Sequence, residues 1–293
     1  TENGDDVLYE VFASRTPVST EIDIQDVYLI IDATLDLLNR EDGSPALDKN
    51  QNPITLNLNA RRNVPPGASK TIIGTKQAVK AVSENQQLRR NSLSLNFIKG
   101  NPTATIDPAK TLFLFPFPLS VNGSNEYVCD QPPANGAGAD TNTTHVGAEP
   151  QSKYAVDFTM PMGTDVFAMR DGVVVAVVKS HPDLPVDANG SSSPAPTDAD
   201  RDKANIVRVR HADGTFAEYV HLKENGANVA LGDPVTAGTT KIGSSGNSGY
   251  STGPHLHVVV LKTAFDEAAN SASLVSISFK FKGPAGSGVI PGK

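Results

Sequence analysis

The stretch His255-Leu256-His257-Val258-Val259-Val260-Leu261 has the composition of a buried β-strand that begins with polar residues. Its run of β-branched apolar residues favours a strand over a helix. Because successive strand side chains point to opposite faces, His255 and His257 project to one face and Leu256 to the other. Two imidazoles then share one site, where one can bind a metal ion while the other reaches an activated water. Two surface histidines on an edge strand fit these seven residues equally well.

Short apolar segments separated by turn residues lie on the N-terminal side of this stretch and predict further strands. Arg170-Asp171-Gly172 and Ala212-Asp213-Gly214 each predict the turn of a β-hairpin. Polar stretches without periodicity, at 121–144 and 180–203, predict long surface loops. The expected strands are Tyr154–Phe158, Asp165–Met169, Val173–Lys179, Ile206–His211 and Phe216–Leu222.

The first hundred residues repeat the pattern of short apolar segments and turns. The run Val27–Leu38 also fits a helical period, but its Thr and Ile content favours a strand. This region contains no histidine and no clear charge cluster, so we expect an accessory role for it. The other predicted strands are Val7–Phe12, Thr20–Ile24, Ile54–Leu58 and Leu93–Phe97.

Length and composition predict two all-β domains. The 293 residues exceed what one core usually needs, and 24 Gly and 21 Pro with 19% charged residues suit short strands and turns. The apolar segment Thr111–Pro118 begins a second unit. We therefore expect a β-sandwich-like accessory domain in residues 1–108 and an antiparallel β domain in residues 109–293.

The charge balance excludes some partners. The chain has 25 basic and 32 acidic side chains, a net charge of −7, which argues against nucleic acid or an anionic membrane surface as the main partner. No stretch approaches the ~20 apolar residues of a membrane span. Cys129 is the only cysteine and has no adjacent base, so it is interpreted as incidental. Thr1–Asp6 lacks an initiator Met and a leader, which fits a processed end or a truncated start.

The remaining histidines and one carboxylate extend the predicted site. Asp157 lies in the apolar segment Tyr154–Phe158, where a carboxylate is costly unless it is paired or bound to a metal. His145 closes the polar loop before that segment, and His221 is expected to share a strand face with Tyr219. Two histidines and one carboxylate leave a fourth position open for water, which is typical of catalytic zinc. The last two of the six histidines, His181 and His211, are expected to be exposed and without a role.

Several motifs together resemble the lysostaphin/LytM-type zinc endopeptidases, which cut peptide bonds in bacterial cell-wall peptidoglycan. The resemblance covers roughly 120 residues in the family's order, so chance agreement is a poor explanation. The matching motifs are His145 with Tyr154-Ala155-Val156-Asp157-Phe158, Met160-Pro161-Met162-Gly163-Thr164, Ala168-Met169-Arg170-Asp171-Gly172-Val173-Val174, His211-Ala212-Asp213-Gly214-Thr215, Tyr219-Val220-His221-Leu222, Gly246-Asn247-Ser248-Gly249 and Thr252-Gly253-Pro254-His255-Leu256-His257.

The resemblance implies a role for each site residue. His145, Asp157 and His257 are the implied zinc ligands, His255 the general base, and His221 a residue that orients water or stabilises the oxyanion. The chain departs from the usual pattern in one place: eleven residues separate His145 from Asp157, where family members often have three. Lys153 occupies the short-spacing position. Related sequences with a Tyr-Ala-x-Asp-Phe strand place the histidine further upstream, which keeps His145 as the expected ligand.

The function implied by the resemblance is zinc-dependent hydrolysis of peptidoglycan cross-links or Gly-rich peptides by a secreted or periplasmic bacterial protein. A cell-wall-binding or extracellular structural module with a retained metal site is the alternative. The Gly- and Ser-rich segment 243–253 lacks the ending of a phosphate-binding loop and the Gly-x-Ser-x-Gly spacing of a serine hydrolase. It is expected to shape the wall of the cleft. Loop composition does not reveal which peptide bond is cleaved.

Overall fold

The protein divides into two compact units, Thr1–Gly100 and Asn101–Lys293, which are described separately. Strand, turn and loop account for nearly all of the described chain, which confirms the all-β class. The 3₁₀ helix η1 (Asp198–Lys203) is short, and no helix in these residues has the length and apolar character of a membrane span. The computed structural model describes residues 5–7, 12–14, 26–66, 70–72, 79–82, 85–104, 107, 111–117, 128–133, 145, 151–266, 268–269, 271–283 and 288–289.

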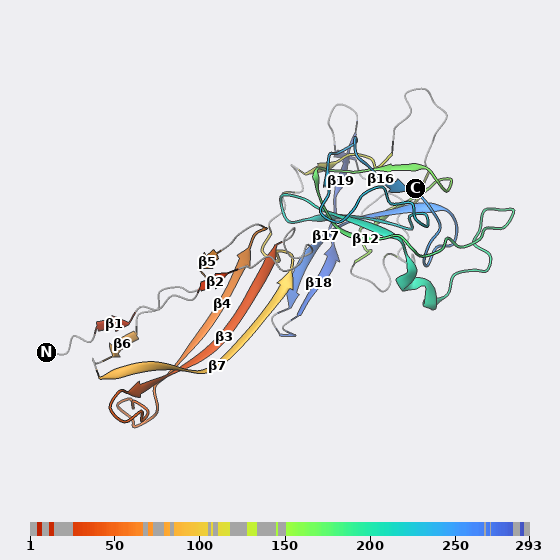
Figure 1. The fold of residues 1–293 in the computed structure, drawn as a ribbon. Helices are drawn as coiled ribbons and strands as arrows, with labels where there is room; N and C mark the ends of the chain where they lie inside the picture. The colour runs from red at the N-terminus through yellow and green to blue at the C-terminus, as the bar shows by residue number, and fades with distance from the viewer. Residues whose placement is uncertain are drawn as a thin grey trace. The chain divides into compact units, whose positions relative to one another are not determined.

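The N-terminal unit contains a three-stranded antiparallel sheet in which β3 lies between β4 and β7 (Figure 1). The segment that also fitted a helical period is a strand, β3, and the adjacent Ile30 and Ile31 are both buried. The predicted strand at 20–24 lies outside the described residues, and the sandwich architecture stays a prediction. The strands are β1 (Asp5–Val7), paired with β6 (Val79–Val82); β2 (Phe12–Ser14), paired with β5 (Lys70–Ile72); and β3 (Val27–Asn39), β4 (Thr55–Val64) and β7 (Gln86–Lys99).

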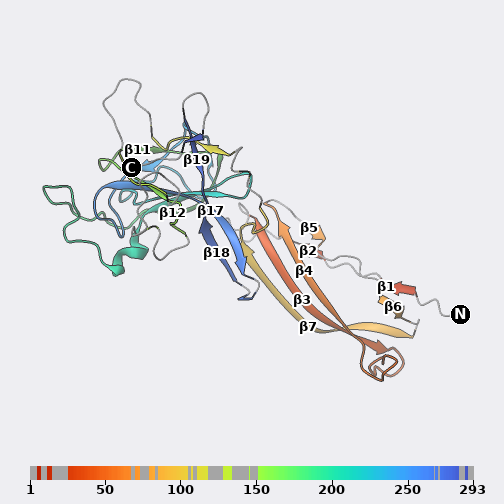
Figure 2. The same cartoon turned by 180° about the vertical axis from the view of Figure 1, so that it is seen from behind.

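The C-terminal unit is built on an eight-stranded sheet with the order β15-β12-β13-β14-β17-β10-β9. Strand β18 pairs with β17 outside this path, and Figure 2 shows these two strands side by side. Two smaller sheets accompany it. The large sheet contains β9 (Val128–Gln131), β10 (Val156–Thr159), β12 (Gly172–Val178), β13 (Ile206–Arg210), β14 (Phe216–Val220), β15 (Pro234–Val235), β17 (His255–Asp266) and β18 (Ser271–Ser276). The small sheets pair β11 (Asp165–Phe167) with β16 (Lys241–Ser244), and β8 (Leu112–Phe113) with β19 (Lys280–Lys282) and β20 (Gly288–Val289).

One predicted hairpin is confirmed and the other is wrong. The turn at Ala212-Asp213-Gly214 joins β13 to β14 as an antiparallel pair. In contrast, β11 pairs with β16 and not with β12, because both edges of β12 are taken by β13 and β15. The stretch 121–144, predicted as a loop, also contains strand β9, which pairs with β10. In both cases the pairing partner lies far away along the chain and leaves no local signal.

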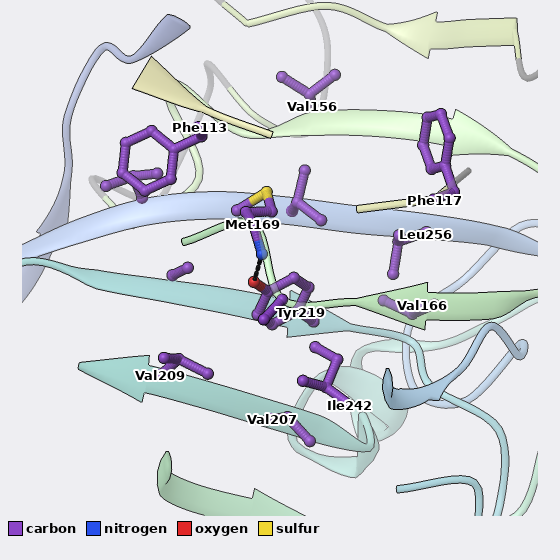
Figure 3. Packing of buried hydrophobic residues seen from close by; sticks show 14 of the residues in the cluster. Phe113, Phe117, Val156, Val166, Met169, Val207, Val209, Tyr219, Ile242 and Leu256 are labelled. Atoms are coloured by element: carbon purple, nitrogen blue, oxygen red, sulfur yellow. Dashed lines mark hydrogen bonds between the residues drawn. The ribbon is translucent and has the colours of Figure 1, made fainter. Parts of the chain in front are cut away.

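The core of the C-terminal unit fills one face of the large sheet (Figure 3). Alternation decides which residues enter it: in β13, Val207 and Val209 are fully buried while their neighbours are partly exposed. Tyr219 is also fully buried, and its hydroxyl accepts a hydrogen bond of 2.6 Å from the backbone N–H of Met169. That bond satisfies a polar group inside an apolar core and ties β14 to the segment before β12.

Candidate metal centre and active site

The register between β10 and β17 places the site on the face of the sheet opposite the core. Asp157 lies across from His257, and Phe158 lies across from Leu256. Phe158 and Leu256 are buried in the core, so alternation directs Asp157 and His257 to the other face. Burial of two apolar side chains therefore orients the carboxylate and the imidazole toward each other.

Three side chains converge at this point. His145 Nε2 lies 3.1 Å from His257 Nδ1 and 3.2 Å from Asp157 Oδ2, and His257 Nδ1 lies 2.9 Å from Asp157 Oδ1. All three residues are buried. Each offers one atom to a common centre, and these atoms lie within 4.8 Å of one another. The arrangement has the compactness of a set of ligands for one metal ion.

The structure brings His145 to Asp157 despite the eleven residues between them. The side chain of His145 is 5% exposed, and its ring meets that of His257 edge to face, with 4.8 Å between the ring centroids. Lys153, which occupies the short-spacing position, is exposed, and its ammonium group lies over the ring of Tyr154. Lys153 therefore does not take the place of a ligand.

His255 lies beside the three converging side chains, on the face that strand alternation predicts. Its Nε2 is 3.7 Å from Asp157 Oδ2. Its Nδ1 is 2.8 Å from the carbonyl oxygen of Gly253, which can only accept a hydrogen bond. In the neutral ring the proton is therefore on Nδ1, and Nε2 keeps its lone pair.

His221 reaches the same site by a route that strand parity does not predict. Strand β14 ends at Val220, and His221 has a φ of 60°. The expectation that His221 shares a face with Tyr219 is wrong, because this left-handed backbone turns the imidazole away from the core that holds Tyr219. Its ring centroid lies 4.5 Å from that of His255 and 5.8 Å from that of His257. A non-glycine residue with positive φ is strained, and such strain is often found at functional sites.

A backbone carbonyl group fixes the tautomer of His221, as one does for His255. Nδ1 of His221 donates to the carbonyl oxygen of Ser248 at 2.7 Å. In the neutral ring Nε2 is therefore an acceptor. The two imidazoles are thus held by carbonyl groups of one segment, 245–253, and each keeps a lone pair on its remaining nitrogen.

Burial and mutual proximity shift the pKa values of the clustered groups. Burial alone would raise the pKa of Asp157, but the imidazoles of His255 and His257, together with hydrogen bonds from His145 and His257, hold it well below its usual range. Burial lowers the pKa of His257, although Asp157 opposes this effect. Burial, reinforced by His255 and His257, lowers the pKa of His221. Asp157 is therefore a carboxylate, and His221 and His257 are neutral near neutral pH, as metal ligation by His257 and Asp157 requires.

A buried polar framework that no sequence pattern predicted holds the backbone beside His221. Asn205 is fully buried; its side-chain amide donates to the carbonyl oxygens of His181 and Leu222, at 2.7 and 3.1 Å. The hydroxyl of Ser248 also donates to Leu222, at 2.7 Å. These bonds hold the residue that follows His221. A sequence signal exists only in the Gly246-Asn247-Ser248-Gly249 motif; Asn205 has none.

His211 is a second correction, because it is fully buried where exposure was expected. Its Nδ1 bonds the carbonyl oxygen of Asp171 at 2.8 Å, and its ring packs edge to face on Phe113. Within the described residues its Nε2 has no hydrogen-bond partner. Burial lowers the pKa of His211 to about 4; the Asp171 carbonyl opposes this shift and the Arg170 charge adds to it, with Asp213 also nearby. His181, the other histidine without an expected role, is partly exposed.

This buried imidazole predicts an acid-sensitive fold. A histidine with a folded pKa of about 4 and an unfolded value of 6.5 binds its proton more readily in the unfolded chain. The contribution of His211 to the free energy of unfolding is therefore fully present above pH 6.5. It falls by about 3 kcal/mol as the pH decreases toward 4. The substitution His211→Gln keeps a hydrogen-bond donor but removes the titrating group. Between pH 6.5 and 4 we expect the free energy of unfolding of this variant to fall by about 3 kcal/mol less than that of the unsubstituted protein.

Urea denaturation at a series of pH values, followed by circular dichroism, measures this difference. His221 and His257 titrate in both proteins, so subtracting the two curves isolates His211. Parallel pH dependences in the two proteins would contradict the prediction.

The comparisons with known proteins point to the same part of the chain. The sequence profile of peptidase family M23 matches residues 151–270. These residues form an M23 peptidase domain. The matched segment contains Asp157, His221, His255 and His257, whereas His145 lies six residues before it and joins the site through the fold.

The M23 domain is similar in sequence to a peptidoglycan endopeptidase and to lysostaphin. The peptidoglycan DD-endopeptidase ShyA of Vibrio cholerae is 36% identical over 101 residues, which are 34% of this chain and 18% of that protein. Lysostaphin of Staphylococcus simulans is 32% identical over 139 residues, 47% of this chain and 24% of that protein. The chain thus spans less than a third of the length of these relatives.

A solved structure of the lysostaphin catalytic domain from Staphylococcus simulans is 25% identical to this chain. The similarity covers 57% of this chain and 86% of that one, with a TM-score of 0.28. Because this score is low, the family assignment rests on the sequence match.

Proposed function

We propose that the M23 domain is a zinc-dependent endopeptidase that hydrolyses peptide bonds in bacterial peptidoglycan. The observation that carries the proposal is the convergence of His145, Asp157 and His257 beside two histidines whose tautomers are held by backbone carbonyls. The names of the M23 relatives, a peptidoglycan DD-endopeptidase and a glycyl-glycine endopeptidase, support the substrate class. A protein with this substrate works outside the cytoplasm, either secreted or in the periplasm.

The donor set of the site fits zinc. Tetrahedral zinc binds nitrogen and oxygen at about 2.0–2.1 Å, so neighbouring ligand atoms are about 3.3 Å apart. His145 Nε2 and His257 Nδ1 are 3.1 Å apart, which is close to that value, and each of them lies within 3.2 Å of one oxygen of the Asp157 carboxylate. Two imidazoles and one carboxylate also form a set that is typical of catalytic zinc, with a position left for substrate or water. A zinc ion held here would supply Lewis acidity to the water and to the scissile carbonyl.

The chain's own residues would supply the proton transfers. His255 offers the Nε2 lone pair, 3.7 Å from Asp157 Oδ2, and is placed to take a proton from the attacking water and return it to the leaving amine. His221 also offers a lone pair at Nε2, because its Nδ1 proton is committed to Ser248. As a neutral acceptor, His221 is suited to orient an O–H group rather than to donate to an oxyanion.

We also propose that the N-terminal unit is an accessory domain. Its described strands contain no histidine and belong to none of the sheets that carry the site. Cell-wall binding is the role that fits a peptidoglycan hydrolase. The proposed substrates include peptidoglycan with glycine bridges and peptidoglycan with D-amino-acid cross-links, because no described contact of the site selects one bond over the other.

Digestion of purified peptidoglycan tests the proposal. We expect the zinc-loaded chain to release free amino groups from peptidoglycan with glycine bridges, from directly cross-linked peptidoglycan, or from both. Chelator should abolish the release and added zinc should restore it. Mass analysis of the fragments identifies the cleaved bond. A zinc-loaded chain that binds both polymers and leaves them intact would support the non-catalytic cell-wall module instead.

A further inference from the structure

We propose that Asn247 and Ser251 are positioning residues that hold His255 in the Nδ1-protonated form and fix the orientation of its ring. The inference rests on the proposed function, in which His255 accepts a proton at Nε2. Both residues are buried, at 0% and 1% exposure, and neither contacts the three converging side chains by any described hydrogen bond.

Two hydrogen bonds fix the orientation of the Asn247 amide. Its Nδ2 lies 2.9 Å from the carbonyl oxygen of Leu184 and 3.0 Å from Ser192 Oγ. A carbonyl oxygen only accepts, so the amide nitrogen must face Leu184. Ser192 in turn donates its own proton to the backbone oxygen of Ser251 at 2.7 Å, which leaves its oxygen free to accept from Asn247. The amide oxygen of Asn247 therefore faces Ser251.

Ser251 presents its hydroxyl to two acceptors. Its Oγ lies 2.7 Å from Asn247 Oδ1 and 2.8 Å from the carbonyl oxygen of Gly253. Both of these atoms are acceptors, and a serine hydroxyl has a single proton. Whichever of the two receives that proton, Ser251 Oγ presents only a lone pair to its remaining neighbour, Nδ1 of His255, at 3.1 Å.

Nδ1 of His255 lies between two acceptors, Gly253 O at 2.8 Å and Ser251 Oγ at 3.1 Å. Both acceptors stabilise the tautomer with a proton on Nδ1, so Nε2 faces Asp157 with its lone pair. Two acceptors at different positions also restrain rotation of the ring, which one acceptor does not. Asn247 thereby acts on His255 through Ser251.

The proposal predicts a kinetic loss without loss of substrate binding. We expect Ser251→Ala to lower kcat by about 10- to 100-fold, the range for residues that orient catalytic side chains, with KM changed less than kcat. Ser251→Thr keeps the oxygen and should restore most of the rate. The matched control is Ser245→Ala, which removes another fully buried hydroxyl of the same segment; that hydroxyl donates to Pro161 and accepts from Thr164. We expect this control to keep its kcat.

Nitrogen NMR of the histidine rings tests the tautomer independently of activity. In the zinc-loaded protein, at a pH where His255 is neutral, the ring should show a protonated Nδ1 and an unprotonated Nε2. The Ser251→Ala variant should show an increased share of the other tautomer or averaged signals. A protonated Nε2 in the unsubstituted protein overturns the inference, even if Ser251→Ala does not fold.

The combined readouts separate this inference from the proposed function. A protein that shows the expected tautomers but no hydrolysis contradicts the enzyme and keeps the positioning role. A protein that hydrolyses peptides, with kcat and tautomer unchanged in Ser251→Ala, contradicts the positioning role and keeps the enzyme.

Discussion

Asp157→Ala is expected to remove zinc from the site and to abolish hydrolysis. Asp157 supplies the only carboxylate among the three converging side chains and lies within 3.2 Å of Nε2 of His145 and Nδ1 of His257. Its loss leaves two imidazoles without the negative charge that would balance the ion. We expect zinc affinity to fall by on the order of 1000-fold, which corresponds to about 4 kcal/mol. Zinc content after dialysis, together with peptidoglycan digestion, measures both effects.

Asp165→Ala is the matched control for this substitution. Asp165 lies in the same domain and pairs with Lys241 at 2.6 Å, but it is half exposed and lies on β11, outside the site. We expect its removal to leave zinc content and hydrolysis unchanged. An Asp157→Ala protein that still holds one zinc per chain would show that the three converging residues are not the metal site.

His255→Ala is expected to abolish most of the hydrolysis while the zinc stays bound. His255 is not one of the three converging residues proposed to hold the metal, so its removal leaves their side chains in place. It does remove the Nε2 lone pair placed to accept the proton, and general-base catalysis of this kind contributes about 100- to 10,000-fold. We expect kcat to fall by that factor. Steady-state kinetics and zinc analysis on the same sample distinguish this result from that of Asp157→Ala.

His181→Ala is the control for His255→Ala. The hydrogen bonds that join His181 to Asn205 use only the backbone of His181, so the substitution leaves them in place. Its imidazole is partly exposed and has no place in the proposed chemistry. A His255→Ala protein with an unchanged kcat would remove His255 from the proton transfer, and His221 would then be the next residue to substitute.

The pairing of Asp157 with His257 is a feature that local sequence patterns could predict. Alternation within 255–261 predicts that His255 and His257 share a face, and the apolar Leu256 assigns the other face to the core. The carboxylate within an apolar segment is a similar signal, because its burial requires a partner. Both inferences depend on backbone geometry over a few residues, and the structure places all three side chains as predicted.

The position of His221, in contrast, could not be predicted from strand alternation. Alternation predicts the core face for His221, and a φ of 60° reverses this. The reversal is held by contacts with distant residues: Ser248 accepts from the ring, and Asn205 and Ser248 hold the next carbonyl. Only the fold assembles these contacts. The pattern Tyr219-Val220-His221-Leu222 carries no sign of the reversal.

By itself, the sequence determined the all-β class, the strand that carries His255 and His257, and the family motifs of residues 151–270. Each is a local property, set by side-chain alternation or by residues a few positions apart. The tertiary structure decided that His145 reaches the site, that His221 turns toward it, that His211 is buried and that β11 pairs with β16. These outcomes depend on free energies of packing and hydrogen bonding between segments distant in the chain, which no local pattern records.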